Sequence, residues 1–199
     1  MNNSLPKLAV FISGTGTNLQ ALIEAAKKKK LEAEIALVVS SSEAALGLSK
    51  ATKAKIPAYI YLPKEYQSKE EAAQALMGKL KEFKIDFIIL AGYIKLIAGE
   101  IIAAFENRII NIHPALLPKY GGKGMYGTHV HEAVLAAGDK ESGMTIHLVD
   151  EQYDHGRVLT QIKVPVYDDD TPALLAQRIQ KEEHKHYPIV INKFIKGEL

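Results

Sequence analysis

Short apolar segments alternate with amphipathic segments over the first 113 residues of the chain. Apolar runs rich in β-branched and aromatic residues predict buried strands, and they cover residues 7–13, 34–40, 57–62, 86–92 and 108–114. Apolar positions at helical spacing predict helices between the strands, over residues 19–30, 43–54 and 68–83. This alternation indicates right-handed βαβ units and a parallel sheet with helices on both faces.

The pattern changes after Pro114. A Gly-rich loop is expected over residues 118–127, followed by a helix over 129–138. Two partly alternating segments, 143–150 and 158–167, predict an antiparallel pair of strands, and a final helix extends to about Phe194. No repeat or linker interrupts the pattern. The predicted fold is therefore a single α/β domain over residues 1–199, Rossmann-like, with a mostly parallel sheet and an antiparallel C-terminal addition.

Three helix starts carry capping signals. Asn18 is expected to cap the first helix, and Thr171 the last. Ser68 and Glu71 have the spacing of a capping box.

Composition excludes several classes of protein. The hydrophobic fraction of 47% and the charged fraction of 24% are typical of a globular domain and exclude whole-chain disorder. The absence of cysteine excludes disulfides, thiolate nucleophiles and cysteine-bound metals. A net charge of +2, with few arginines among the basic residues, argues against nucleic acid as the main partner. No apolar stretch reaches the roughly 20 residues that span a bilayer, and no signal peptide is recognisable, so we expect a cytoplasmic protein without a membrane partner.

The segment SGTGTN, residues 13–18, joins the first strand to the first helix. Its glycines allow a tight turn, and the free amides of a helix N-terminus favour an anion. Leu19 occupies the third glycine position of the dinucleotide pattern, and no acidic residue ends the second strand. A phosphate monoester therefore fits better than NAD or ATP. The alternative is a tight βα turn without a ligand.

Two further segments carry candidate catalytic side chains. Asn111 and His113 lie two residues apart at the carboxyl end of the fifth strand, so both emerge on one face, where they could stabilise an oxyanion. Asp154, in the turn DEQYDHG, could raise the pKa of His113 and orient its ring. The alternatives are a strand-end pair that satisfies loop carbonyls and a solvated turn carboxylate. His129 and His131 face different ways on a helix and His184 and His186 suit packing, so no metal site is expected.

These segments, in this order and at this spacing, resemble the phosphoribosylglycinamide formyltransferase family, also called GAR transformylases. The resemblance rests on VFISGTGTNLQALI, RIINIHPALLPKY, GMTIHLVDEQYDHGRVLTQ and QKEEHKHYP and covers nearly the whole chain. It implies transfer of the formyl group of 10-formyltetrahydrofolate, as cosubstrate, to the amine of glycinamide ribonucleotide, without a metal. We expect a monomer or homodimer.

The resemblance assigns roles to residues. It implies that Asn111, His113 and Asp154 are catalytic, and that Gly16, Thr17, Asn18 and Glu183 bind the substrate. Lys69, Ile94, Lys95, Leu96 and Ile97, together with Asn111, match positions that border the folate. Residues 1–113 would form a phosphate-binding half and residues 114–199 would complete the folate site.

Other readings stay open at this point. Methionyl-tRNA formyltransferase and formyltetrahydrofolate deformylase share the NIHPALLP and DxG segments but carry an additional domain, so the length of 199 residues favours the purine enzyme. A non-catalytic nucleotide-binding module using only the SGTGTN loop is the alternative of a different class.

Overall fold

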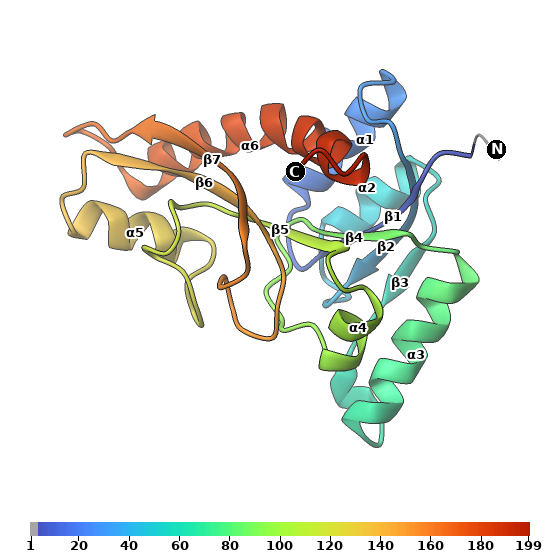
Figure 1. The fold of residues 1–199 in the computed structure, drawn as a ribbon. Helices are drawn as coiled ribbons and strands as arrows, with labels where there is room; N and C mark the ends of the chain where they lie inside the picture. Colours follow the sequence, from blue (N-terminus) through green and yellow to red (C-terminus); the bar gives the residue numbers. More distant parts are fainter. Residues whose placement is uncertain (1–3) are drawn as a thin grey trace.

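The computed structural model describes residues 4–199, which form one seven-stranded sheet with helices on both faces (Figure 1). The strand order is β3-β2-β1-β4-β5-β6-β7. The first five strands are parallel, and β6 and β7 extend the sheet antiparallel to β5 and to each other. This confirms the predicted fold class.

The parallel strands are β1 (Lys7–Ile12), β2 (Glu34–Ser40), β3 (Ala58–Ile60), β4 (Phe87–Leu90) and β5 (Ile109–His113). The antiparallel strands are β6 (Glu141–Leu148) and β7 (Val158–Pro165). The helices are α1 (Thr17–Lys27), α2 (Gly47–Lys53), α3 (Lys69–Glu82), α4 (Gly99–Ala104), α5 (Thr128–Ala136) and α6 (Pro172–Ile195), with a short 3₁₀ helix, η1, over Pro63–Glu65.

The sheet divides the hydrophobic core into two layers. Side chains of β1 alternate between them: Leu8, Val10 and Ile12 pack with α1, α2, α5 and α6, whereas Ala9 and Phe11 pack with α3 and α4. The β1 side chains from Leu8 to Ile12 are all buried, because helices cover both faces of a central parallel strand. Among residues 4–199, no helix is long and apolar enough to cross a membrane.

The helix starts follow the capping signals in two of three cases. The side chain of Ser68 accepts a hydrogen bond from the Glu71 amide, and that of Thr171 accepts one from the Leu174 amide, as predicted. The prediction for Asn18 is wrong. The helix α1 starts two residues earlier, its cap is Gly16 in a left-handed conformation, and no side chain caps it. Asn18 is buried inside the first turn.

Several other predicted boundaries differ from the observed ones. The helix expected over residues 43–54 is confined to Gly47–Lys53, and the third strand to Ala58–Ile60. The helix α4 lies in a segment for which no element was predicted. It is short, and only Ile101 among its residues is fully buried, so it lacks the periodic signal of a longer amphipathic helix.

The Thr171 cap fixes the start of α6, the helix that crosses the sheet beside the N-terminal half (Figure 1). Replacing Thr171 with Ala should lower the free energy of unfolding by about 1 kcal/mol, because the Leu174 amide loses its acceptor. Thr171→Ser keeps the hydroxyl and should retain most of that stability. Urea unfolding of the three proteins measures the difference, and equal midpoints would contradict the capping role.

Candidate active site

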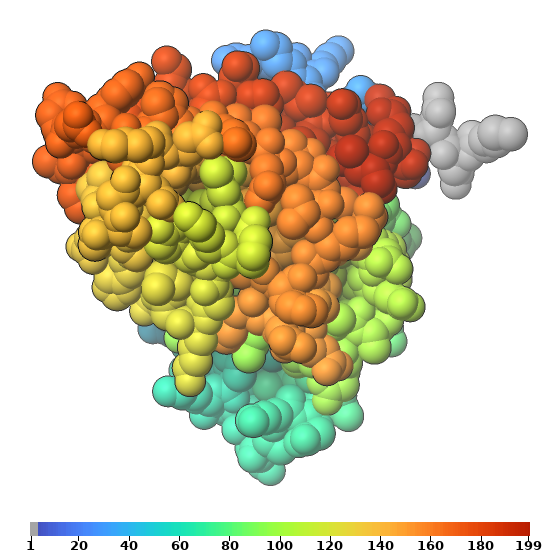
Figure 2. Space-filling model, turned by 60° about the vertical axis from the view of Figure 1, so that its left-hand side comes forward, coloured from blue at the N-terminus to red at the C-terminus, as the bar shows by residue number. Residues whose placement is uncertain are grey.

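A cleft of about 790 Å³ lies over the carboxyl ends of the parallel strands. Its walls come from the loop after β1, the segment after β4, the end of β5, the Gly-rich loop and the turn between β6 and β7. Figure 2 shows the Gly-rich loop, in yellow, and the β6–β7 turn, in orange, on one face of the molecule. Both segments come from the C-terminal half, so that half closes a cleft whose floor is the parallel sheet.

The loop 13–18 is held by close backbone packing. Gly16 has a φ of 67°, and a Cβ atom there would lie 2.7 Å from the Cα of Gly47. The amide of Gly47 donates to the carbonyl of Gly14 at 3.1 Å, and the Nζ of Lys50 donates to the carbonyl of Gly16 at 3.1 Å. The loop therefore rests on α2, and the first-turn amides of α1 remain free of intrahelical acceptors, as an anion site requires.

Two side chains of α1 reach across to α6. The Nδ2 of Asn18 donates to the Oε2 of Glu183 at 2.9 Å, and the Nε2 of Gln180 donates to the hydroxyl of Thr17 at 2.9 Å. Glu183 is buried, and burial raises the pKa of its carboxyl group, while the hydrogen bond from Asn18 lowers it by less. The side-chain amide of Asn18 and the carboxyl group of Glu183 thus form a hydrogen-bonded pair. This pair lies at the end of the cleft where residues 13–18 are located.

Asn111 and His113 lie at the carboxyl end of β5, and Asp154 lies in the turn between β6 and β7. The Oδ2 of Asp154 is 3.5 Å from the Nδ1 of His113 and accepts a hydrogen bond from the Gly122 amide at 2.9 Å. Its Oδ1 accepts a hydrogen bond from the Nδ2 of Asn111 at 3.4 Å. The three predicted catalytic side chains therefore converge, and the Gly-rich loop contributes one donor to them.

Hydrogen bonds to backbone carbonyls determine which ring nitrogen of His113 and which of His147 carries a proton. The Nε2–H of His113 donates to the carbonyl of Tyr120 at 2.7 Å, and the Nδ1–H of His147 donates to the carbonyl of Leu148 at 2.7 Å. A carbonyl only accepts, so each of these nitrogens bears a proton. The Nε2 of His147 lies 3.1 Å from the Nδ2 of Asn111 and 3.5 Å from the Oδ1 of Asp154. In His113 the Nδ1, which faces Asp154, is the nitrogen that gains or loses a proton.

Burial decides the ionisation of His113. Its side chain is 4% exposed, and burial lowers the pKa of the imidazole. The charge of Asp154 and the Tyr120 carbonyl raise the pKa, but by less, so it lies below the ordinary value for histidine. Asp154 thus acts on the pKa of His113 in the predicted direction, but burial has the larger effect. Burial opposes ionisation of Asp154 itself, but the contacts with His147, His113 and the Gly122 amide outweigh it and lower the pKa of the carboxyl.

The arrangement matches a known family. The formyl transferase family model covers residues 6–191. The chain belongs to this family.

Relatives place it among the phosphoribosylglycinamide formyltransferases. It is 38% identical to the enzyme of that name from Haemophilus influenzae, over 98% of this chain and 90% of the relative. It is 45% identical to the chloroplastic enzyme of that name from Vigna unguiculata, over 93% of this chain. The chain spans 59% of that relative's length and 64% of the length of a similar one from Arabidopsis thaliana. The predicted family is confirmed.

Solved structures agree with the sequence comparison. Glycinamide ribonucleotide transformylase 1 from Symbiobacterium toebii superimposes with a TM-score of 0.90 at 36% identity, covering 99% of this chain and 90% of that one. Phosphoribosylglycinamide formyltransferase from Brucella melitensis gives a TM-score of 0.87 at 43% identity, covering 96% of both chains. The fold of this formyl transferase is thus that of its solved relatives over almost its full described length.

Of the residues to which the resemblance assigns roles, all but one line the cleft: Gly16, Thr17, Asn18, Ile94, Lys95, Leu96, Ile97, Asn111, His113, Asp154 and Glu183. Lys69 is the exception. It is exposed at the start of α3 and does not line the cleft. Within residues 4–199 no group of three or more His, Asp or Glu side chains is arranged to hold a metal ion.

Sequence reasoning missed three residues of the site. His147 lies opposite Asn111 in the β5–β6 register, and its signal in the sequence was a histidine between the apolar residues Ile146 and Leu148. Gln180 precedes Glu183 by three residues, so both can face the cleft from α6. His131 was considered only as a metal ligand. It is buried, lines the cleft and has a pKa lowered by burial and by the proximity of His113.

The balance of burial and charge at His113 can be measured by NMR titration of its ring protons. In the unliganded protein the pKa should lie below the ordinary value of about 6.5. Asp154→Asn should lower it further, because the neighbouring negative charge that favours the imidazolium is lost. Asp86→Asn is the control, since Asp86 precedes β4 and so lies at the amino ends of the parallel strands, away from the cleft. A rise in the His113 pKa in Asp154→Asn would contradict this electrostatic account.

Proposed function

We propose that this chain transfers the formyl group of 10-formyltetrahydrofolate to the amine of glycinamide ribonucleotide, a step of de novo purine synthesis. The observation that carries the proposal is the convergence of Asn111, His113 and Asp154 in the cleft that also contains the anion loop. The names of its relatives support the choice of substrates. The non-catalytic alternative gives these three side chains no reason to meet.

The proposed chemistry requires one proton to move. The amine nitrogen attacks the formyl carbon, and its lone pair forms the new C–N bond while the carbonyl oxygen becomes an oxyanion. The bond from that carbon to N10 of the folate then breaks, and its electron pair stays on N10. The amine loses a proton and N10 gains one, so the reaction needs a group that accepts a proton and returns it.

His113 suits this role because its Nδ1 is free to accept a proton while Nε2 stays bonded to Tyr120. Once protonated, the imidazolium lies beside the carboxylate of Asp154, which stabilises the charge. The imidazolium can also stabilise the oxyanion and then return the proton to N10. A low pKa in the unliganded site keeps His113 ready to accept a proton first.

Asn111 is proposed as a second oxyanion donor. Its Nδ2 contacts His147 at 3.1 Å and Asp154 at 3.4 Å. The longer contact is the weaker hydrogen bond. Asn111 would exchange that contact for the oxyanion, and His147 would keep the amide oriented.

The two substrates would bind at opposite ends of the cleft. The amides of Gly16, Thr17 and Asn18 would bind the phosphate of the ribonucleotide, and Glu183 would lie near its amine end. The segment 94–97 would border the pteridine with its backbone and with the exposed side chains of Ile94 and Leu96. We propose accordingly that residues 1–113 provide the phosphate-binding half and residues 114–199 complete the folate site.

Lys69 is proposed as a basic residue near the ligands by resemblance alone. The lysines that line the cleft are Lys95 and Lys123, so these two are better placed to meet the carboxylates of a folate tail. A monomeric or homodimeric state and a cytoplasmic location stay predictions. Two plant relatives are named as chloroplastic enzymes.

The proposal is tested by mixing the protein with 10-formyltetrahydrofolate and glycinamide ribonucleotide and following the absorbance of the folate product. His113→Ala and Asn111→Ala should each reduce turnover by roughly 100-fold or more, because each removes an oxyanion donor. Glu141→Gln, at an exposed ion pair on β6, is the control. Release of formate with no formylated amine would instead identify a deformylase, and no change in either substrate would refute the proposal.

Lys50 provides a separate test of the phosphate site. Its ammonium group contacts the carbonyl of Gly16, so a phosphate bound by the loop would lie near it. Lys50→Met should raise the KM for glycinamide ribonucleotide about fivefold, equivalent to about 1 kcal/mol, and leave the KM for the folate unchanged. Lys53→Met, an exposed lysine of the same helix, should change neither. Equal increases in both KM values would argue against a phosphate at this loop.

A further inference from the structure

The backbone of Tyr120 connects the catalytic histidine to a polar cluster outside the cleft. Its carbonyl accepts the Nε2–H of His113 at 2.7 Å. This contact selects the nitrogen that carries the fixed proton and leaves Nδ1 for proton exchange. The position of the Tyr120 carbonyl therefore matters for any reaction in which His113 moves a proton.

Tyr120 has an unusual backbone conformation, with a φ of 56°. Residues that carry a Cβ atom adopt this left-handed region only when surrounding contacts hold them there. After Tyr120 the chain is held at Gly122, whose amide donates to the Oδ2 of Asp154 at 2.9 Å. A second restraint comes from the side chain of Tyr120 itself.

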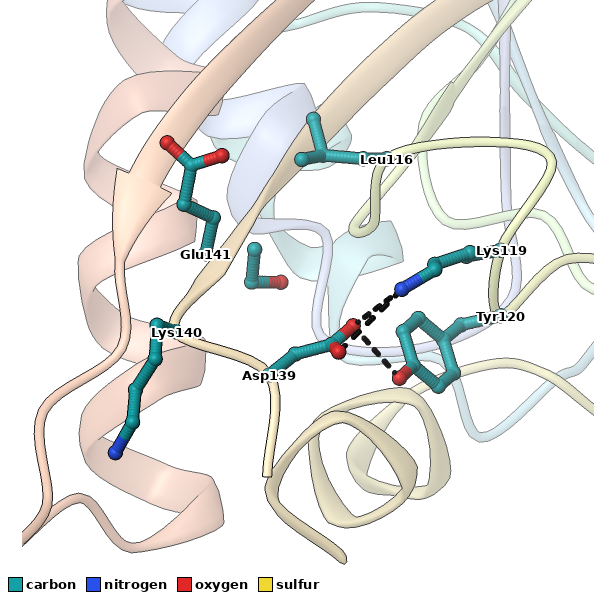
Figure 3. A pocket seen from close by; sticks show the side chains of 7 residues that line it. Leu116, Lys119, Tyr120, Asp139, Lys140 and Glu141 are labelled. Carbon is teal, nitrogen blue, oxygen red and sulfur yellow. Dashed lines mark hydrogen bonds and ion pairs between the residues drawn. The ribbon is translucent and has the colours of Figure 1, made fainter. Parts of the chain in front are cut away.

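The side chain of Tyr120 is fixed at its hydroxyl. The hydroxyl donates to the Oδ2 of Asp139 at 2.9 Å, and the Nζ of Lys119 contacts the two oxygens of the same carboxylate at 3.0 and 3.3 Å. Figure 3 shows Lys119 and Tyr120 converging on Asp139 from one side. The Tyr120 ring is partly buried against the core layer that contains α5 and α6.

A second cavity, of about 410 Å³, adjoins this cluster. Leu116, Lys119, Tyr120 and Asp139 line it together with the start of β6 (Figure 3). Close packing cannot hold Tyr120 on the side where this cavity lies. On that side the hydrogen bond to Asp139 replaces packing as the restraint.

We propose that Asp139 is a positioning residue for the formyl transfer. It anchors the hydroxyl of Tyr120, holds that residue in its left-handed conformation, and so keeps the Tyr120 carbonyl against the Nε2–H of His113. Asp139 touches neither His113 nor the cleft and acts through Tyr120. The catalytic part of this inference rests on the proposed function, whereas the effect on the His113 tautomer does not.

The tautomer can be read from the ¹⁵N shifts of the His113 ring. In the unaltered protein, above the pKa of His113, the proton should lie on Nε2. Tyr120→Phe and Asp139→Ala should each give a mixture of Nε2–H and Nδ1–H forms, because the carbonyl is no longer held in place. Asp139→Asn retains an oxygen that accepts from the tyrosine hydroxyl and should restore the Nε2–H form. Lys119→Met is the control, because its exposed ion pair contributes little.

The same variants are assayed for formyl transfer. Tyr120→Phe and Asp139→Ala should lower kcat by roughly 10-fold or more and leave both KM values within about twofold, because the substrates bind elsewhere in the cleft. Asp139→Asn and Lys119→Met should keep kcat near that of the unaltered protein. An unchanged His113 tautomer in both Tyr120→Phe and Asp139→Ala, each with a native amide spectrum, would overturn the inference.

Two other outcomes are also decisive. Loss of kcat together with raised KM values and an unchanged tautomer would assign Asp139 a general structural role and overturn the inference. If the unaltered protein transfers no formyl group, the proposed function fails, and the tautomer comparison still decides whether Asp139 positions His113.

Discussion

A buried carboxylate must be surrounded by donors, and this requirement organises the centre of the molecule. The side chain of Asp154 is 10% exposed and meets the Gly122 amide, the Nδ2 of Asn111 and the ring of His113. These partners come from β5 and the Gly-rich loop, and Asp154 comes from the turn after β6. Each of the three segments therefore contributes to compensating one largely buried ionised group. The antiparallel extension of the sheet and the closed loop therefore depend on one another.

Much of the fold was predictable because its signals are local. Continuous apolar runs marked the parallel strands, and hydroxyl side chains at Ser68 and Thr171 marked two helix starts. The error at Asn18 has a tertiary cause. A capping rule considers neighbours in sequence, whereas the amide of Asn18 donates to Glu183, 165 residues away. Gly16, which can take the left-handed conformation without strain, starts the helix instead.

The candidate site was predictable only in part, for a similar reason. The spacing of Asn111 and His113 placed them on one face, and the resemblance brought Asp154 to them. His147 could not be recognised without the register of β5 and β6, which sets it opposite Asn111. The ionisation of His113 could not be predicted from a nearby carboxylate alone, because burial acts in the opposite direction and is the larger effect. Backbone carbonyls such as that of Tyr120 have no sequence signature at all.

The contact between Gly16 and Gly47 limits how this family member could acquire a different ligand at the loop. A Cβ at Gly16 would lie 2.7 Å from the Cα of Gly47, and one at Gly47 would lie 2.6 Å from the Cδ1 of Ile12. Gly16 cannot accept a side chain unless the backbone moves, and a side chain at Gly47 would displace the end of Ile12. In the proposed function the loop would therefore bind its anion through backbone amides, which substitution of side chains does not exchange. Evolution or design of a new specificity would have to proceed through neighbouring side chains, such as Gln180 and Glu183 on α6, while the loop stays constant.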